Sequence, residues 1–125
     1  MILGIGNDII EVERIKSALE KYQSRFLNRI FTPAEQAYCL QHTEAARHLA
    51  GRFAAKESVV KALGIGFRNG VNWTDIEINN DTHGKPLVIC SSYLHSLFPS
   101  LELLISISHC HHYATAFAMW IKNPG

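Results

Sequence analysis

The sequence predicts an α+β domain in which an N-terminal strand and several helices pack on a mainly antiparallel sheet. Three observations support this prediction. An apolar, strand-like run opens the chain, segments with a helical period fill residues 11–63, and short apolar or alternating segments follow from residue 75 onward. Helices followed by a series of strands with short turns are typical of the α+β class. The chain has 125 residues, enough for one hydrophobic core but not for two, so residues 1–125 are expected to form a single domain.

The first element is the strand expected at residues 2–10, ILGIGNDII. Gly4 and Gly6 would allow another group to approach this strand closely, and Asp8 interrupts its apolar run. Apolar residues then recur at every third or fourth position, which predicts one continuous helix over residues 11–26.

Two further helices are expected in the middle of the chain. The stretch Thr32-Pro33-Ala34-Glu35 is a typical helix start, because the threonine can cap the helix and the glutamate can complete a capping box. This helix is expected to end near residue 41. A longer helix should span residues 44–63 and end at the glycines of Gly64-Ile65-Gly66.

The remaining elements are short. Asn69-Gly70 and the cluster at residues 80–86 mark turns, since they are rich in residue types that favour tight backbone bends. Strands are expected at residues 75–79, 87–90, 101–109 and 113–121, with a short helix at residues 93–98.

Composition and charge narrow the class of protein. Hydrophobic residues make up 47% of the chain and charged residues 18%, which is typical of a globular protein. The net charge of +1 gives no general attraction to nucleic acid, and no such partner is expected. The three cysteines lack the spacing of a zinc or disulfide framework. The N-terminus lacks signal-peptide features and no apolar run approaches the roughly 20 residues that span a bilayer, so we expect a cytoplasmic protein without membrane contact.

Asp8 is the first candidate for chemistry. It can be a carboxylate at a strand end that accepts hydrogen bonds from backbone N–H groups. It can equally be a ligand of Mg²⁺, an ion that takes one or two protein carboxylates and completes its coordination with water and phosphate oxygens. The neighbouring glycines would leave room for a bulky anion.

Glu57 and Lys61 are the second candidates. They are four residues apart with the acid first, the spacing of a helical surface ion pair worth roughly 0.2–0.5 kcal/mol. Ala50 and Ala54 on the same helix face favour another interpretation, because small side chains let a ligand come close. If Glu57 meets Asp8 in space, two carboxylates can hold one divalent cation while Lys61 faces the phosphates bound to it.

The run His109-Cys110-His111-His112 allows two interpretations as a site. Two imidazoles on one face could bind zinc, but no second cluster completes four ligands. A polar hairpin between two strands is the simpler interpretation. His109, at the expected end of a strand, could then hold a phosphate or a ribose, or be a partly buried histidine without a ligand.

Basic residues follow one face of the first expected helix. Arg14, Lys21 and Arg25 recur at helical spacing, with Arg29 beyond them. Such a face is commonly just solvated. It would also suit an acidic docking partner, for which charge complementarity sets the association rate and the register.

Six motifs together resemble one known family. They are GIGNDI at residues 4–9, FTPAE at 31–35, AGRFAAKESVVKALGIG at 50–66, DIEI at 75–78, GKP at 84–86 and SISH at 106–109. In order and spacing they are similar to the holo-acyl-carrier-protein synthases, the short bacterial type of 4′-phosphopantetheinyl transferase. The resemblance implies the fold of that family. It also implies a magnesium-dependent transfer of 4′-phosphopantetheine from coenzyme A to a serine of apo-acyl carrier protein, releasing adenosine 3′,5′-bisphosphate for fatty acid biosynthesis.

The resemblance also assigns roles to residues. It implies catalytic roles for Asp8, Glu57 and Lys61, with Asp8 and Glu57 as magnesium ligands and Lys61 at the pyrophosphate. Glu57 is then the expected base, acting directly or through a metal-bound water. The implied coenzyme A contacts are Arg52, Lys61, Gly64, Gly66, Lys85, Pro86 and His109, and the implied carrier-protein contacts are Arg14, Lys21 and Arg25. The family further implies a homotrimer with active sites between subunits.

Four positions depart from the family pattern: Asn7, Ser58, Ile65 and Cys110. The last two remove hydroxyl groups that coenzyme A could contact. Two other functions use the same residues: a magnesium-dependent phosphohydrolase of a nucleotide-type pyrophosphate, and a non-catalytic module that docks an acidic partner through the basic helix. Lys56, turned away from the face of Glu57, has no predicted role.

Overall fold

The computed structural model describes residues 1–68 and 70–122. Its elements are β1 (Ile2–Glu11), α1 (Val12–Tyr22), α2 (Ser24–Ile30), α3 (Pro33–Leu40), α4 (Ala45–Leu63), the 3-10 helix η1 (Trp73–Asp75), β2 (Ile76–Asn80), β3 (Pro86–Cys90), α5 (Ser92–Leu97), β4 (Glu102–His109) and β5 (Tyr113–Ile121). The predicted α+β class is confirmed, and the ends of the predicted strands shift by one residue at most. Asn69 of the expected turn lies outside the described residues, whereas Gly70 has a turn-like φ of 86°.

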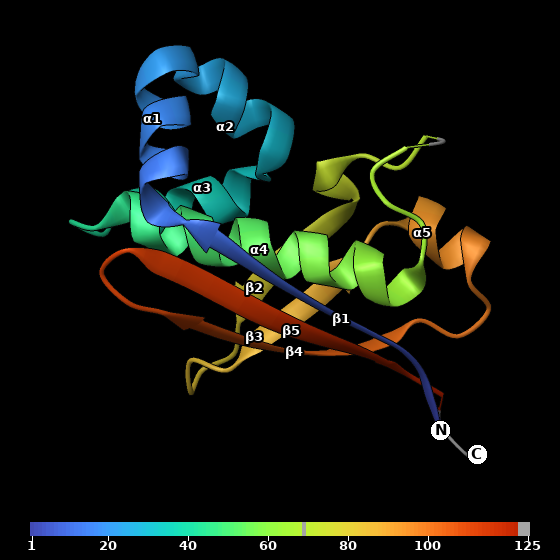
Figure 1. Cartoon of the computed structure of the whole chain (residues 1–125). Helices are drawn as coiled ribbons and strands as arrows, with labels where there is room; N and C mark the ends of the chain where they lie inside the picture. Colours follow the sequence, from blue (N-terminus) through green and yellow to red (C-terminus); the bar gives the residue numbers. More distant parts are fainter. Residues whose placement is uncertain (69, 123–125) are drawn as a thin grey trace.

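The strands form two antiparallel sheets rather than the single sheet that the sequence suggested. The larger sheet has the strand order β1-β5-β4, and β2 pairs with β3 in a separate sheet. Helix α4 packs against all three strands of the larger sheet. Figure 1 shows α4 crossing one face of this sheet, with α1, α2 and α3 gathered near one end of the helix and α5 near the other.

Two glycines let α4 lie directly against β1. A Cβ atom added to Gly6 would be 2.2 Å from the carbonyl oxygen of Ser58, and one added to Gly4 would be 2.0 Å from that of Ala62. Any side chain at these positions would therefore push the helix away from the strand. The close approach expected at these glycines is confirmed. The space that the glycines leave is filled by α4, so a ligand at Asp8 would have to approach from beside the helix.

Replacing Gly6 with alanine is expected to lower the free energy of unfolding by about 1–3 kcal/mol, because the new methyl group overpacks a backbone contact. Gly51→Ala is the matched control. Gly51 is also buried, but its added Cβ would meet only the Cγ2 methyl of Ile107, at 3.1 Å. Alanine is also preferred over glycine inside a helix such as α4. Urea denaturation of both variants measures the difference, and equal losses would contradict the close-packing argument.

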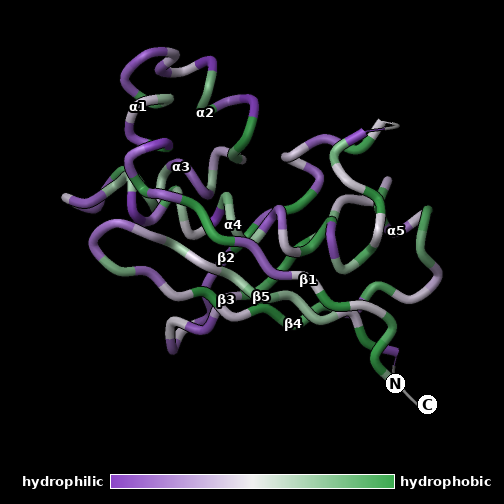
Figure 2. The backbone as a smooth tube through the Cα atoms, in the orientation of Figure 1, coloured by the Kyte–Doolittle hydropathy of each residue, from purple (hydrophilic) through white to green (hydrophobic). Residues whose placement is uncertain are grey.

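The first helical segment is two helices and not one. Between α1 and α2, Gln23 has a φ of 49°, which ends the first helix and redirects the chain. The prediction of a continuous helix over residues 11–26 is therefore wrong. Neither glycine nor proline marks the break in the sequence. Figure 2 shows long hydrophilic stretches along this helix pair, in contrast to the hydrophobic strands below it.

The two faces of the larger sheet differ in how they are covered. Ala114, Ala116 and Ala118 of β5 are buried on the face that α4 covers. The opposite face is open and of mixed polarity. Ile5 and Ile9 are exposed by 60% and 65%, and the same face carries the exposed polar residues Asn7, Ser106, Ser108 and Thr115. Exposed apolar surface of this kind commonly marks an interaction site.

No helix within the described ranges combines the length and the apolar character needed to cross a bilayer.

Helix α3 begins with the predicted capping box, which is confirmed. The Thr32 hydroxyl accepts from the N–H of Glu35, and Glu35 Oε1 accepts from the N–H of Thr32 at 2.9 Å. Glu35 is fully buried and also accepts from the N–H of Ile78 in β2 at 2.8 Å. The third partner of the Glu35 carboxylate is Lys56 of α4, whose Nζ lies 2.6 Å from Glu35 Oε1. Lys56, which has no predicted role, therefore helps join α4 to α3 and β2.

Candidate active site

Asp8, Glu57 and Lys61, here called the Asp8 cluster, lie where β1 packs against α4. Lys61 Nζ is 3.1 Å from Asp8 Oδ1 and donates a hydrogen bond to the Asn7 carbonyl oxygen at 3.0 Å. The Lys61 side chain is half exposed, whereas that of Asp8 is only 18% exposed. Among the residues that the structure describes, the ion pair of Lys61 is with Asp8 and not with Glu57. The interpretation of Glu57 and Lys61 as a simple helical surface pair is therefore wrong.

Glu57 interacts electrostatically with both Asp8 and Lys61. Partial burial raises the pKa of the Glu57 carboxyl above its ordinary value, the negative charge of Asp8 raises it further, and Lys61 opposes the rise. A carboxylate with a raised pKa binds a proton more readily near neutral pH, which is the property that a general base needs.

The two carboxylates of the Asp8 cluster fit a magnesium site. The negative charge of Asp8 disfavours the ionised form of Glu57, and a divalent cation between the two carboxylates would offset this repulsion. Mg²⁺ needs only one or two protein carboxylates when phosphate and water complete its coordination. In the part of the chain that is described, no group of three or more histidine, cysteine, aspartate or glutamate residues could hold a metal, so a zinc site at residues 109–112 has no support.

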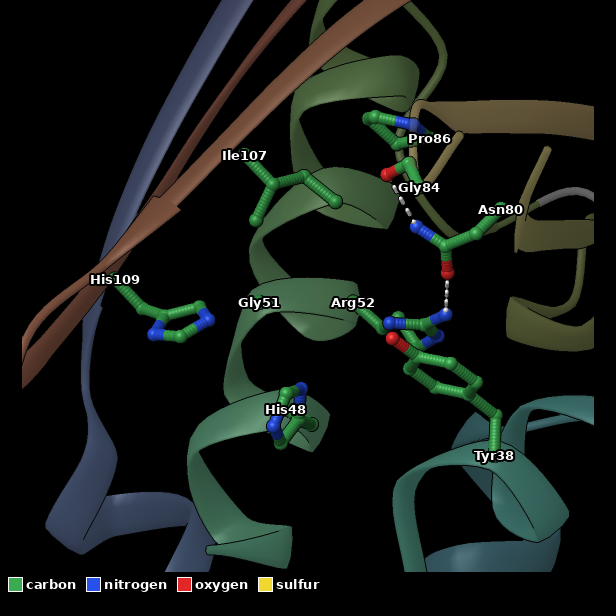
Figure 3. A pocket seen from close by; sticks show the side chains of 9 residues that line it. All are labelled: Tyr38, His48, Gly51, Arg52, Asn80, Gly84, Pro86, Ile107 and His109. Atoms are coloured by element: carbon green, nitrogen blue, oxygen red, sulfur yellow. Dashed lines mark hydrogen bonds between the residues drawn. The ribbon is translucent and has the colours of Figure 1, made fainter. Parts of the chain in front are cut away.

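A second part of the site is a pocket of about 210 Å³, here called the Arg52 pocket. Figure 3 shows side chains from α3, α4, β4 and the β2–β3 region converging on it. Its lining residues are Tyr38, His48, Gly51, Arg52, Asn80, Gly84, Pro86, Ile107 and His109. Three predicted coenzyme A contacts, Arg52, Pro86 and His109, therefore come together in one cavity.

Arg52 is held in place by its neighbours on both sides. One guanidinium nitrogen, Nη2, donates to Asn80 Oδ1 at 2.6 Å, and the guanidinium lies 4.3 Å from the centre of the Tyr38 ring. Asn80 in turn donates to the Gly84 carbonyl oxygen at 3.0 Å, which ties the β2–β3 turn to the pocket. Arg52 is only 6% exposed, and its Nε has no hydrogen-bond partner among the described residues. A buried cation with an unused donor is suited to bind an anion.

Sequence reasoning missed three polar side chains of the Arg52 pocket: Tyr38, His48 and Asn80. They come from three different elements, so no local spacing connects them. The one available signal was that His48 precedes Arg52 by four positions, which places both on the same face of a helix.

The other predicted coenzyme A contacts lie at two places. Gly64 and Gly66 follow the end of α4 with positive φ angles of 74° and 67°, as expected for a glycine helix end. They lie one turn beyond Lys61 along the chain, and Gly64 lines a separate hollow with Arg68. Lys85 is exposed in the β2–β3 turn, between two residues that line the Arg52 pocket.

The Asp8 cluster and the Arg52 pocket lie on opposite flanks of α4. Asp8 pairs with Ala116 of β5, which in turn pairs with Ile107 of β4, a residue of the pocket. Paired residues point to the same face of a sheet, and neighbouring strands are about 4.8 Å apart, so Asp8 and Ile107 stand about 10 Å apart beneath the helix. Within one chain, α4 therefore separates the two parts of the site.

The predicted carrier-protein contacts Arg14, Lys21 and Arg25 are all exposed. The break at Gln23 separates them, because Arg14 and Lys21 belong to α1 while Arg25 belongs to α2. Arg25 lines a groove of about 460 Å³ together with Ala18, Tyr22, Phe26, Arg29 and Ile30. This groove combines aromatic and apolar side chains with two positive charges.

The four departures from the family pattern have local explanations. The Asn7 side chain points to the open face of the sheet, so only its carbonyl oxygen joins the Asp8 cluster. The buried Ser58 hydroxyl donates to the Ala116 carbonyl oxygen at 3.0 Å, which ties α4 to β5. Ile65 packs against the core. Cys110 is exposed in the β4–β5 hairpin, where backbone N–H groups lower the pKa of its thiol.

Comparisons with known proteins show the family to which this chain belongs. Residues 4–118 match the model of the 4′-phosphopantetheinyl transferase superfamily. The chain is 66% identical over 120 residues to the holo-[acyl-carrier-protein] synthase of Protochlamydia amoebophila, which covers 96% of this chain and 98% of the relative. It is 48% identical over 118 residues to that of Chlamydia pneumoniae, with 94% and 96% covered.

Solved structures of the same kind are also similar. The crystal structure of holo-[acyl-carrier-protein] synthase from Neisseria meningitidis superposes with a TM-score of 0.88 at 34% identity, over 98% of this chain and all of that one. The structure from Bacillus anthracis, in complex with coenzyme A (3′,5′-ADP), gives 0.82 at 38% identity over 96% of both chains. The chain therefore belongs to the 4′-phosphopantetheinyl transferase superfamily. Within this class of transferases, the proteins it matches here are holo-[acyl-carrier-protein] synthases, which confirms the predicted fold and the resemblance seen in the six motifs.

Proposed function

We propose that the chain acts as a holo-[acyl-carrier-protein] synthase, moving the 4′-phosphopantetheine group of coenzyme A onto a serine of apo-acyl carrier protein. The product nucleotide is adenosine 3′,5′-bisphosphate. The reaction takes place in the cytoplasm and serves fatty acid biosynthesis. Residues 1–125 form the single domain that catalyses it. The observation that carries the proposal is the meeting of Asp8, Glu57 and Lys61 in a member of this superfamily. Coenzyme A in the Bacillus anthracis structure supports the choice of donor.

Glu57 acts as the base in this proposal. The carrier serine oxygen forms a bond to the phosphorus that bears pantetheine, and the bond from that phosphorus to the bridging oxygen breaks. The serine proton passes to Glu57, whose pKa is raised by burial and by Asp8. General base catalysis by a positioned side chain contributes about 10²–10⁴-fold to a rate.

Lys61 faces the pyrophosphate and stabilises the leaving oxygen. Its ammonium group is held by Asp8 and the Asn7 carbonyl, yet half of the side chain remains open to a ligand. Mg²⁺ held by Asp8 and Glu57 would supply charge neutralisation on the pyrophosphate. A preorganised positive charge at the position where negative charge develops stabilises the transition state, and electrostatic stabilisation of this kind is usually the largest single contribution to catalysis.

A homotrimer would bring the two parts of the site together. The Asp8 cluster of one chain would face the Arg52 pocket of a neighbour across the subunit boundary, and coenzyme A would span both. The exposed Ile5 and Ile9, on the open face of the sheet, would be covered in the same assembly. Light scattering tests this part of the proposal, since a homotrimer has three times the mass of the chain.

The decisive experiment for the function is a mass measurement. Apo-acyl carrier protein incubated with the chain, coenzyme A and Mg²⁺ should gain the mass of the phosphopantetheine arm, and the gain should disappear in the presence of a chelator. A phosphohydrolase would instead consume coenzyme A in the absence of carrier protein. A non-catalytic module would bind carrier protein without any mass gain, and either result would contradict the proposal.

Replacing Arg14 with glutamate is expected to raise the KM for acyl carrier protein roughly tenfold or more, an effect of about 1.4 kcal/mol. Carrier proteins of this kind are acidic, so the reversed charge repels the partner while coenzyme A binding stays unchanged. Lys16→Glu is the matched control, because Lys16 is an exposed residue of the same helix two positions away. Steady-state kinetics with each substrate varied in turn measures both effects. A weakened coenzyme A affinity in the Arg14 variant would contradict the assigned surface.

A further inference from the structure

Three histidines meet at the wall of the Arg52 pocket. The rings of His42 and His48 are stacked with their centroids 3.9 Å apart, and the His48 ring lies edge-on to His109 at 5.4 Å. His48 stands one turn before Arg52 on α4, and Figure 3 shows both at the cavity with His109. None of the roles assigned above uses His48.

The surroundings of His48 favour its neutral form. The titratable and charged groups that face it are Tyr38 from α3, His42 from the turn before α4, Arg47 and Arg52 from α4, and His109 from β4. None of these groups carries a negative charge at neutral pH. Partial burial, followed by the two histidines and the two arginines, lowers the pKa of His48 below its ordinary value.

The lining of the Arg52 pocket is suited to bind an anion. The pocket contains the buried Arg52, whose Nε has no hydrogen-bond partner among the described residues. At about 210 Å³ it is smaller than the roughly 300–1,000 Å³ pockets that enclose whole drug-sized ligands, so it would take one end of a ligand. If the pyrophosphate of coenzyme A lies at Lys61, the phosphate left for this pocket is the terminal one on the ribose. A phosphate monoester of this kind carries about −1.5 to −2 charges at pH 7.

We propose that His48 takes up a proton when the terminal phosphate of coenzyme A enters the Arg52 pocket, so that binding of this phosphate is coupled to protonation. The inference rests on the proposed function. An opposite charge within about 4–6 Å stabilises the charged form of a group, so the phosphate reverses the effect of the surrounding positive charges on the imidazole. Binding and protonation then strengthen each other by the same factor. The enzyme thereby favours coenzyme A over dephospho-coenzyme A most strongly at mildly acidic pH.

The test is calorimetric titration of coenzyme A into the wild-type protein, His48→Gln and the control His95→Gln, in buffers with different ionisation enthalpies at pH 7. His95 is exposed on α5, away from the pocket. Wild type and the His95 variant should take up a larger fraction of a proton per site than His48→Gln. The affinity advantage of wild type over His48→Gln should fall by up to tenfold per pH unit between about pH 6 and pH 8.

Two results would overturn the proposal. One is equal proton uptake by wild type and His48→Gln, or an affinity difference that is the same at every pH, which would make His48 a fixed part of the pocket wall. The other is a His48-dependent proton uptake that persists with dephospho-coenzyme A, which lacks the terminal phosphate. The dephospho-coenzyme A titration uses the wild-type protein as well, so it remains informative if His48→Gln folds poorly. The carrier-protein mass assay separates the two proposals, because a wild-type protein that modifies carrier protein without this proton linkage contradicts only the role of His48.

Discussion

Glu57→Gln is expected to reduce the rate of phosphopantetheine transfer by about 10²–10⁴-fold. The amide cannot accept the serine proton, and it is a poorer ligand for Mg²⁺ than a carboxylate. The rate is measured as the mass gain of apo-acyl carrier protein at saturating coenzyme A and Mg²⁺. Glu102→Gln, at the start of β4 and outside both the Asp8 cluster and the Arg52 pocket, is the control and should keep the wild-type rate. A Glu57→Gln enzyme with unchanged activity would remove the role assigned to this carboxylate.

The same variant should be more stable than wild type in the absence of metal. Because the pKa of Glu57 is raised in the folded protein by burial and by Asp8, the folded state binds the proton more tightly than the unfolded chain. The ionised carboxylate therefore opposes folding at pH 7, and this opposition disappears as the pH falls below the ordinary carboxyl pKa of about 4.3. Thermal melting should show a higher Tm for Glu57→Gln at pH 7 and a difference that shrinks towards pH 4. A lower Tm at pH 7 would mean that the lost activity reflects damage to the fold.

The parts of the fold with strong local signals could be predicted from the sequence. The capping box of Thr32 and Glu35 and the glycines after Leu63 determine where helices start and stop through local hydrogen bonds and backbone freedom. The break at Gln23 could not be predicted, since it depends on how two amphipathic helices pack and not on a special residue type. The division of the strands into two sheets likewise depends on long-range packing.

The Asp8 cluster could be predicted in composition but not in geometry. Two acids and a lysine suggested a metal and phosphate site, and the family resemblance sharpened that suggestion. Spacing alone favoured an ion pair between Glu57 and Lys61, whereas Lys61 pairs with Asp8 of β1, 53 residues earlier in the chain. The Arg52 pocket was harder still, because Tyr38 and Asn80 reach it only through the packing of α3 and β2 around α4.

Lys56 shows most clearly that the surroundings of a side chain cannot be predicted from local sequence spacing. It stands one residue before Glu57 and has no role predicted from the sequence, yet its side chain has no exposed area. Its Nζ pairs with Glu35 and donates to the carbonyl oxygens of Ile30 and Trp73 at 2.7 and 3.1 Å. Burial lowers the pKa of this lysine, and Glu35 opposes the shift. An ion pair buried this completely persists only when each partner is satisfied.

Lys56→Met is therefore expected to lower the free energy of unfolding by about 3–5 kcal/mol, because it leaves the Glu35 carboxylate buried without its cation. The double variant Glu35→Gln/Lys56→Met should lose less than the sum of the two single variants, since no unpaired charge remains. Glu44→Gln is the control. It breaks the pair with Arg47, where the Glu44 side chain is 62% exposed, and should change stability by at most about 1 kcal/mol. Urea denaturation of Lys56→Met, Glu35→Gln, the double variant and Glu44→Gln measures these differences in the free energy of unfolding.

A Lys56→Met loss no larger than that of Glu44→Gln would contradict the argument. The expected outcome also links stability to the site. Glu35 stands on α3 and accepts from Ile78 on β2, the two elements that carry Tyr38 and Asn80 to Arg52. The buried pair therefore fixes the walls of the Arg52 pocket relative to α4. Coenzyme A affinity, measured at a temperature where each variant is fully folded, should fall in Lys56→Met and remain unchanged in Glu44→Gln.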